Sequence, residues 1–310
     1  MKKTDSVFRA LLLTAVLFSA LNTGPARAQA FMEDKFNQKD TWWDDGFWDD
    51  GVLNAPANYR VTRQNNPYPS GDTAMPAVLF RPEGKGRFPA VLFQHGRAGM
   101  MDEIVAHAKR VAARGFVVLA ADIYGGRFID PRPIAHDYAL EDDVNAALDA
   151  LLARPEVATS RACLYSHTRG GYYTLKVAVT KKRQDDAAAC YVSYYPHMQD
   201  PNAPEADQVY RYAPEADQLK IPALVFIGDE EQYQRRRSIE TALLSMREAG
   251  RDATLMIYPG VGRGFDFRPE RIRTFADDLA SKDALARAAR FMRKHLKAYM
   301  KGKTLKAHVK

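Results

Sequence analysis

Continuous apolar runs of strand length recur along the chain, and stretches with helical periodicity separate them. Continuous rather than alternating apolarity is typical of parallel strands that helices cover on both faces. The expected strands are 90–94, 117–121, 162–165, 191–195, 223–227 and 254–258, and the expected helices are 102–114, 140–153, 172–180, 237–249 and 274–300. This alternation predicts an α/β fold, with a doubly wound, mostly parallel sheet in a single domain over 59–300.

Two further segments precede these runs. Residues 59–63 and 77–81 have the composition of paired strands, and the turn-rich stretch between them predicts a hairpin. Before them, residues 31–58 form an aromatic and acidic arm. It holds all three tryptophans of the chain, Trp42, Trp43 and Trp48. Such a cluster can bind sugars or a partner, but we favour an arm fastened to the domain surface.

Residues 1–30 have the layout of a secretory signal peptide. A positively charged start is followed by an apolar run over 10–21 and by a small-x-small ending at 28–30. The apolar run is shorter than the ~20 residues of a membrane-spanning helix, and no later segment resembles one. We therefore expect cleavage after Ala30 and a periplasmic or secreted mature protein without a transmembrane segment.

The net charge of +7 comes from the two ends of the chain. Residues 1–30 carry +3 and residues 293–310 carry +7, which leaves −3 for residues 31–292. This acidic body disfavours nucleic acid as a partner. The basic tail, 301–310, is most simply solvated, and a weak contact with an anionic membrane surface is the alternative.

The chain has two cysteines, Cys163 and Cys190, and both fall in expected buried strands. Side chains on two parallel strands rarely meet the geometry of a disulfide. We therefore predict two buried free thiols without a catalytic role, and a bridge between them is the alternative.

The strongest chemical signal follows the expected strand 162–165. The sequence Ser-His-Thr-Arg-Gly-Gly over 166–171 places small residues two positions before and two positions after the hydroxyl of Thr168. A strand, a tight turn and a helix with this spacing indicate a nucleophile elbow, in which a strained turn raises one side chain above the sheet. Ligands of such sheets lie beyond the carboxyl ends of the strands, where this turn is expected.

From about residue 77 to 298, the sequence resembles the dienelactone hydrolase family of the α/β-hydrolase superfamily. Five segments carry the resemblance: FPAVLFQHG at 88–96, ADIYGG at 121–126, SHTRGG at 166–171, IPALVFIGDEE at 221–231 and YPGVGRGF at 258–265. The first would supply His95 and Gly96 to an oxyanion loop, and the second would place Tyr124 at a strand end.

The resemblance also shows that two positions of the catalytic triad are substituted. Thr168 stands where the family has cysteine, and Arg263 stands where it has histidine. The acid position is Glu231, with Asp229 as the alternative register. A threonine hydroxyl needs a neighbouring base, which contributes about 10²–10⁴-fold to a rate, and a guanidinium cannot supply it. We expect Arg263 to pair with Glu231 instead.

Further arginines follow the same strand ends. Arg97, Arg127 and Arg169 each lie in one of the matched loops, so that up to four arginines, with Arg263, are expected at one mouth. This pattern predicts a pocket for a small carboxylated ligand. The alternative is that some of them turn to water or pair with Asp122, Asp130 or Glu231.

A histidine elsewhere would have to replace the missing base. His197 follows the strand that borders the elbow, and hydrogen bonding of its ring to the backbone is the alternative to a catalytic role. The other candidates are His95 and His167. We assign no role to His107, His136, His295 and His308. No metal-ligand spacing or phosphate-binding glycine pattern is present, so we expect no metal or cofactor.

Together these observations predict an exported hydrolase of small, carboxylated esters or lactones. Thr168 would attack, Glu231 would orient, and the amides near Gly96 and Arg169 would bind the oxyanion. His197 or His95 would be the base. The alternative is an inactive protein of the same fold that binds an anionic ligand or assists a periplasmic partner.

Overall fold

The computed structural model describes residues 39, 42–54 and 58–302. The chain divides into two units, 1–43 and 44–310. The expected signal peptide and residues 303–310 of the basic tail lie outside the described residues. The fold described below is that of the second unit.

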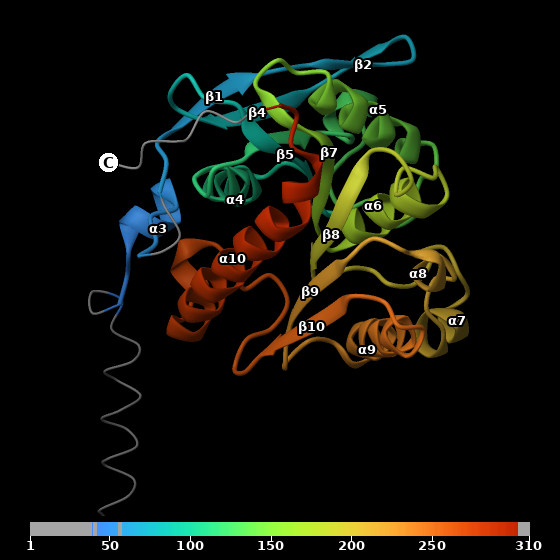
Figure 1. Ribbon diagram of the computed structural model, residues 1–310. Helices are drawn as coiled ribbons and strands as arrows, with labels where there is room; N and C mark the ends of the chain where they lie inside the picture. The colour runs from blue at the N-terminus through green and yellow to red at the C-terminus, as the bar shows by residue number, and fades with distance from the viewer. Residues whose placement is uncertain (1–38, 40–41, 55–57, 303–310) are drawn as a thin grey trace, which may run out of the picture. The chain divides into compact units, whose positions relative to one another are not determined.

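An eight-stranded sheet forms the centre of this unit (Figure 1). Within this sheet, β4 pairs antiparallel with its neighbours β1 and β6, and each further pair is parallel. In sheet order the strands are β1 (Val61–Asn65), β4 (Ala77–Pro82), β6 (Val117–Ala121), β5 (Phe88–Gln94), β7 (Val157–His167), β8 (Ala188–Tyr194), β9 (Ala223–Gly228) and β10 (Ala253–Tyr258). The predicted mostly parallel sheet is confirmed.

Helices cover both faces of the sheet, and β6, β8 and β9 are buried along their whole length. One face carries α4 (Asp102–Ala112) and α10 (Phe275–Leu296), and the other carries α5 (Leu140–Leu152), α6 (Arg169–Val179) and α9 (Tyr233–Glu248) (Figure 1). The remaining short helices are α3 (Asp45–Asp50), α7 (Glu205–Tyr210), α8 (Glu215–Gln218), η2 (Gly125–Arg127), η3 (Glu270–Ile272) and η4 (Lys297–Tyr299). Within the described ranges, no helix combines the length and apolarity that crossing a membrane requires.

The predicted hairpin is present, because β1 and β4 pair antiparallel. A smaller hairpin of β2 (Tyr68–Ser70) and β3 (Thr73–Met75) fills the turn-rich stretch between them. Its Ser70 hydroxyl donates a hydrogen bond of 2.6 Å to Asp143 on α5. This contact ties the small hairpin to the face of the domain.

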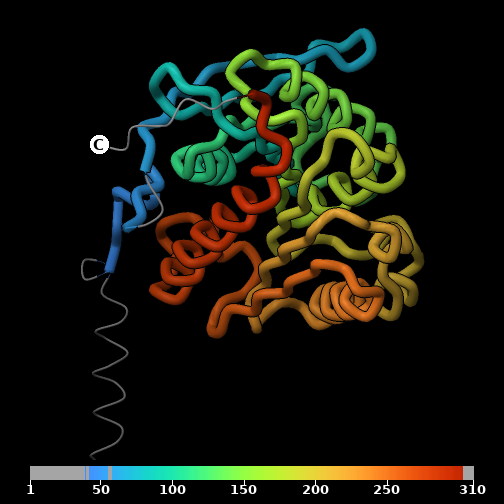
Figure 2. The backbone as a smooth tube through the Cα atoms, viewed as in Figure 1, coloured from blue at the N-terminus to red at the C-terminus, as the bar shows by residue number. Residues whose placement is uncertain are grey.

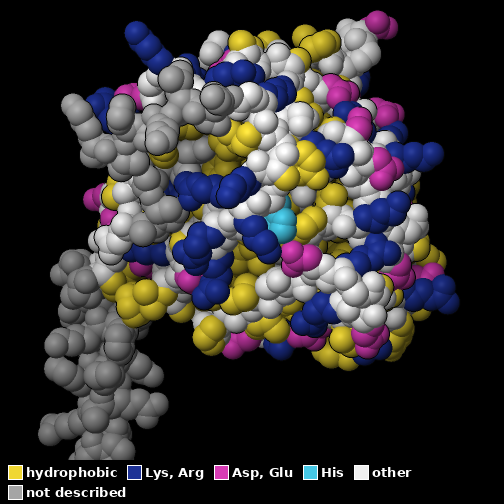
Figure 3. All heavy atoms as spheres, in the orientation of Figure 1, with side chains coloured by type: hydrophobic (Ala, Val, Ile, Leu, Met, Phe, Trp, Pro, Cys, Tyr) yellow, Lys and Arg dark blue, Asp and Glu magenta, His cyan; other side chains and the backbone are white. Residues whose placement is uncertain are grey.

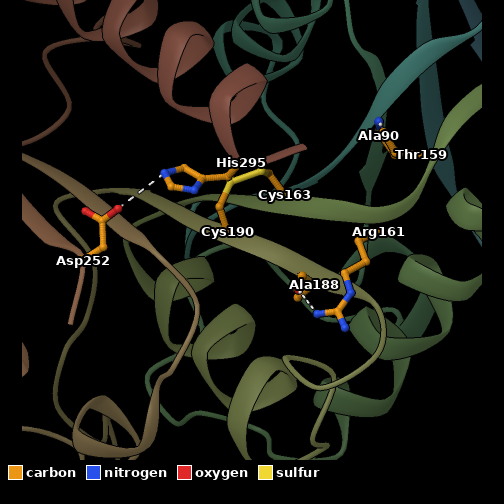
Figure 4. Close-up of a disulfide and its surroundings, with 8 residues drawn as sticks. All are labelled: Ala90, Thr159, Arg161, Cys163, Ala188, Cys190, Asp252 and His295. Atoms are coloured by element: carbon orange, nitrogen blue, oxygen red, sulfur yellow. Dashed lines mark hydrogen bonds and ion pairs between the residues drawn. A yellow bond between two sulfur atoms is a disulfide. The ribbon is translucent and has the colours of Figure 1, made fainter. Parts of the chain in front are cut away.

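The prediction of two free thiols is wrong, because Cys163 and Cys190 form a disulfide (Figure 4). The two residues are directly paired on the neighbouring strands β7 and β8, with their Cα atoms 4.6 Å apart. A register shift between Ala162 and Cys163 creates this pairing. Paired residues of parallel strands project to the same face, so both side chains can meet.

The described part of the tryptophan-bearing arm packs on the domain through α3. The Trp48 side chain is buried, and its Nε1 donates a hydrogen bond of 2.9 Å to Asp278 on α10. The buried guanidinium of Arg110 on α4 donates to the carbonyls of Trp48 and Asp266, each at 2.9 Å. A single side chain therefore joins the arm to the loop before α10.

The C-terminal end of the described chain returns to the sheet (Figure 2). After α10, Met300 forms an isolated antiparallel bridge with Thr159, and the Lys301 amide donates to the carbonyl of Ala158 at 2.6 Å. These bonds hold the end of the described chain beside the first residues of β7. The turn that carries Thr168 lies at the opposite end of that strand.

Candidate functional site

Thr168 lies in a strained turn between β7 and α6. Its backbone angles are φ 50° and ψ −119°, in a region that a β-branched residue rarely adopts. Hydrogen bonds hold the turn: its amide donates to Tyr194 at 3.1 Å, and its carbonyl accepts from His197 at 2.8 Å and from Gly171 at 3.0 Å. This is the local geometry of a nucleophile elbow.

Glycines allow the elbow to approach the loop after β5. A Cβ atom at Gly96 would lie 1.8 Å from the Thr168 hydroxyl oxygen, and one at Gly170 would lie 2.6 Å from the Gln94 carbonyl. The Arg97 amide donates to the Thr168 hydroxyl at 3.3 Å. The hydroxyl therefore faces the loop whose amide is an expected oxyanion donor.

The expected pairing of Arg263 with Glu231 is present. Arg263 Nη1 lies 3.0 Å from the buried Glu231 Oε1, and the guanidinium stacks over the Tyr195 ring at 5.2 Å. Asp229, the alternative register, instead accepts a hydrogen bond from the Gly260 amide at 2.8 Å. A guanidinium has no lone pair to offer, so Arg263 itself cannot accept the Thr168 proton.

A pocket of about 500 Å³ opens above Thr168. Its wall includes Gly96, His167 and His197, and we call it the arginine pocket because five arginines line it: Arg97, Arg132, Arg235, Arg263 and Arg268. No described aspartate or glutamate is among its lining residues. The space-filling view shows Lys and Arg side chains gathered at the middle of this face, around a histidine (Figure 3).

The expected placement of Arg127 at the mouth is wrong. Its guanidinium forms a two-pronged pair with the buried Asp143, at 2.6 and 2.9 Å, and also donates to Thr73 at 2.9 Å. The nearest buried carboxylate thus takes this side chain away from the pocket and towards the small hairpin.

The side chain of Arg169 does not line the pocket either. Its guanidinium donates to the carbonyls of Pro133, Ile134 and Ala135 at 2.7–2.9 Å. A buried cation without a carboxylate is stabilised by such carbonyls, because each one satisfies a donor. Arg169 therefore fixes the loop that follows Arg132.

His95 and Tyr124 lie beneath the oxyanion loop rather than in the pocket wall. His95 Nδ1 is 2.7 Å from the Gly96 carbonyl, and the His95 and Tyr124 rings make an edge-to-face contact at 4.8 Å. Burial lowers the pKa of His95 below its usual value. These residues pack under the loop, and neither is among the lining residues of the arginine pocket.

His197 is buried against the arginine pocket. Among the described residues, its Nδ1 has no hydrogen-bond partner. Burial, followed by the charges of Arg263 and Arg235, lowers the pKa of His197 well below its usual value. The ring is therefore neutral near pH 7 and a weak proton acceptor.

The sequence missed a buried network beneath the pocket. The Asp266 carboxylate lies 2.7 Å from His167 Nε2 and 2.8 Å from His107 Nδ1, and it accepts a hydrogen bond from the Tyr195 hydroxyl. His107, to which the sequence assigned no role, also bonds the Tyr165 hydroxyl through Nε2 at 2.7 Å. The signal available was the position of Asp266, three residues after Arg263.

This network is the one described group of three side chains with metal-ligand atoms in mutual reach, all within 4.8 Å. Two histidines and a carboxylate are ligands that transition metals accept. Both carboxylate oxygens, however, are already in contact with Tyr195 or the histidines. The arrangement of these three residues is therefore better explained as a hydrogen-bonded support beneath Arg263 than as an open metal site.

Three of the five pocket arginines were also missed. Arg132 lies in the loop after η2, Arg235 in the first turn of α9, and Arg268 after the loop of Arg263. All three follow the carboxyl ends of parallel strands, so position along the fold was the signal that could have identified them.

A model of the dienelactone hydrolase family matches residues 75–296. Among curated proteins, none matches the chain.

Solved structures show the same fold at low sequence identity. A provisionally named dienelactone hydrolase from Klebsiella pneumoniae is 22% identical with a TM-score of 0.59, over 77% of this chain and 99% of that one. The dienelactone hydrolase-like promiscuous phosphotriesterase P91, from metagenomic libraries, is 21% identical with a TM-score of 0.59, over 76% and 98%. The carboxylesterase EstE1, from a metagenomic library, is 18% identical with a TM-score of 0.59, over 79% and 92%.

Proposed function

The chain belongs to the dienelactone hydrolase family, and on that premise we propose that it hydrolyses small esters or lactones that carry a carboxylate. The observation that supports this proposal is the arginine pocket above Thr168, whose described lining holds five arginines and no acid. Guanidinium groups bind carboxylates through paired, charge-assisted hydrogen bonds. A volume of about 500 Å³ suits a small molecule.

In the proposed reaction, the Thr168 hydroxyl oxygen bonds to the substrate carbonyl carbon. Its proton passes to His197, and the amides of Arg97 and Arg169 bind the oxyanion. The ester C–O bond then breaks, the leaving oxygen takes the proton from His197, and water releases the acid from Thr168. Because His197 is a weak base, we expect slow turnover.

One observation favours a second function, binding of an anionic ligand without turnover. Among the described residues, the hydrogen bond of the Thr168 hydroxyl comes from the Arg97 amide, and no base is paired with it. The position that corresponds to the family's histidine holds Arg263, whose guanidinium already forms an ion pair with Glu231.

A panel of activated esters and lactones, with and without a carboxylate, separates the two functions. We expect hydrolysis that prefers carboxylated substrates and falls about 10²-fold or more in Thr168→Ala. Thr241→Ala on the exposed face of α9 is the matched control and should retain full rates. Unchanged turnover in Thr168→Ala would remove the proposed nucleophile.

A double variant tests the inactive alternative. If the wild type shows no turnover and Thr168→Ser with Arg263→His gains it, the protein is a ligand-binding scaffold with a disabled triad. Ligand titration of both proteins by calorimetry checks that the pocket remains intact.

We also propose that the protein is exported and periplasmic or secreted. Support comes from the signal-peptide layout of residues 1–30 and from the Cys163–Cys190 bridge, which an oxidising compartment favours. Cell fractionation with N-terminal sequencing should find a mature chain that begins at Phe31. A full-length chain in the cytoplasmic fraction would contradict the proposal.

A further inference from the structure

We infer that the arginine pocket is built for a ligand with at least two negative charges on oxygen, and that Arg235 selects it. The inference rests on the proposed function only in assigning the ligand to the same pocket. The inference adds the charge of the ligand and the residue that recognises this charge. Neither follows from a hydrolase fold alone.

The pocket has an excess of positive charge that one carboxylate would not balance. Arg263 pairs with Glu231 at 3.0 Å, and Arg268 pairs with Asp277 at 3.2 Å. The other three arginines form no ion pair within 4 Å among the residues that the structure describes: Arg97, Arg132 and Arg235. Three of the five lining cations therefore have no ion-pair partner: Arg97 and Arg132 are exposed to solvent, and Arg235 is half-buried. A single carboxylate would leave two of them unpaired.

Arg235 is the most constrained of the three. It lies in the first turn of α9, and its Nη1 is buried without a hydrogen-bond partner in the described part of the chain. Burial, and then the charge of Arg263, lowers the pKa of Arg235 to about 10. A desolvated guanidinium without a partner is costly, and an anion in the pocket would remove that cost.

Two further groups with free hydrogen-bonding capacity border the same space. Arg263 pairs with Glu231 through Nη1, and its Nη2 is buried without a hydrogen-bond partner. His197 Nδ1 is buried and likewise without one. Both residues line the pocket with Arg235. Hydrogen-bonding groups from three separate segments therefore surround the arginine pocket: the loop after β8, helix α9 and the loop after β10.

These donors match an anion with several oxygens. Arginine forks bind two oxygens each, and neutral histidine can donate one more hydrogen bond. Dicarboxylates and phosphoryl groups share this chemistry. They differ in geometry, because the charges of a phosphoryl group lie on one centre.

Calorimetric titration of the mature protein tests the inference with four probes: acetate, malonate, succinate and inorganic phosphate. We expect the dianions to bind at least about tenfold more tightly than acetate, since each charge-assisted hydrogen bond contributes measurably to affinity. Tighter binding of phosphate than of both dicarboxylates would identify a phosphoryl group, and the reverse order would identify a dicarboxylate. Equal binding of acetate and the dianions, or no binding of any probe, would overturn the inference.

Variants of one helix test the role of Arg235. Arg235→Gln should weaken dianion binding about tenfold or more, while Arg235→Lys should retain part of it. Arg236→Gln is the matched control, because Arg236 lies outside the arginine pocket and pairs with Glu240. Unchanged dianion affinity in Arg235→Gln, with a circular dichroism spectrum like that of the wild type, would overturn the assignment.

These titrations contain no ester, so their outcome is independent of turnover. A protein that binds dianions but hydrolyses no substrate would retain this inference and lose the proposed function. A protein that hydrolyses esters with a single carboxylate but binds no dianion more tightly than acetate would retain the proposed function and lose this inference.

Discussion

At the scale of single residues, Thr168 and Gly96 are a matched pair. The backbone of Thr168 is held in a conformation that costs roughly 1–3 kcal/mol, and the turn is stabilised by its hydrogen bonds to Tyr194, His197 and Gly171. Gly96 leaves the space that the threonine hydroxyl fills. The hydroxyl at position 168 thus requires a glycine at position 96.

We predict that Gly96→Ala destabilises the protein by about 1–3 kcal/mol, because the added methyl overlaps the Thr168 hydroxyl. In Gly96→Ala with Thr168→Ala the closest overlap is gone, so the combined loss should be smaller than the sum of the single losses. Urea unfolding of the four proteins in this cycle measures the difference. Additive losses would contradict the contact.

Acid should destabilise the fold through its buried histidines. Burial lowers the pKa of His107 to about 4 and lowers those of His95 and His197 from 6.5. Well above pH 6.5 these rings are neutral in both the folded and the unfolded state. As the pH falls from 6.5 towards 4, the unfolded chain binds protons that the folded chain does not, so the free energy of unfolding decreases.

For His107 alone this loss reaches roughly 3 kcal/mol once the pH is below 4. Urea unfolding between pH 7.5 and 4.5 checks the direction, and His107→Gln should flatten the slope. A free energy of unfolding that is constant or rises on acidification would contradict the prediction.

Long side chains limit prediction at this scale. The sequence placed Arg127 and Arg169 correctly at strand ends, but their guanidinium groups reach several bonds from the backbone. Their direction depends on Asp143 and on the carbonyls of 133–135, which come from other segments. Arg263 was predictable because the matched segments also supply its partner, Glu231.

At the scale of elements, strands were easier to predict than their register. A run of apolar residues identifies β7 and β8, but the shift beside Cys163 depends on how the two strands fit together. That shift pairs Cys163 with Cys190, so the bridge could not be read from composition.

Removing this bridge should cost about 2–4 kcal/mol, since the cross-link restricts the unfolded chain over a separation of 27 residues. Equilibrium unfolding with and without dithiothreitol measures the loss in one protein. In Cys163→Ala with Cys190→Ala, dithiothreitol should have no further effect. Equal stability of the wild type in both conditions would indicate free thiols instead.

The short helix α3 should contribute strongly to the stability of the fold through the side chain of Trp48. Trp48→Ala is expected to cost about 3–5 kcal/mol, because it empties a buried site and leaves Asp278 without its indole donor. Val52→Ala, at an exposed position just after α3, is the control and should change stability little. Thermal unfolding of both variants compares them, and similar losses would contradict the docking of the arm.

At the scale of the whole molecule, the layered fold was predictable and the pocket wall was not. A strand that is buried on both faces has a continuous run of apolar residues, so β5 to β9 could each be located from the sequence. The arginine pocket instead collects residues from six separate segments. The set of residues that lines this pocket can be recognised only once the ends of the strands are placed side by side.

The overall charge shows the same dependence on three-dimensional arrangement. A body with a net charge of −3 over 31–292 nevertheless gathers five arginines around one volume, while its acids lie elsewhere or behind them. Net charge describes how the molecule behaves in bulk solution, and local charge describes which ligand it selects.

The guanidinium of Arg110 has a thermodynamic consequence of its own. It holds the carbonyls of Trp48 and Asp266 at once, so α3 and the loop that carries Arg263 share one donor. Detaching the helix would leave that cation half-satisfied and loosen the loop. By reciprocity, an anion that orders the loop must also protect the arm, and a protease should cleave it more slowly when the pocket is filled.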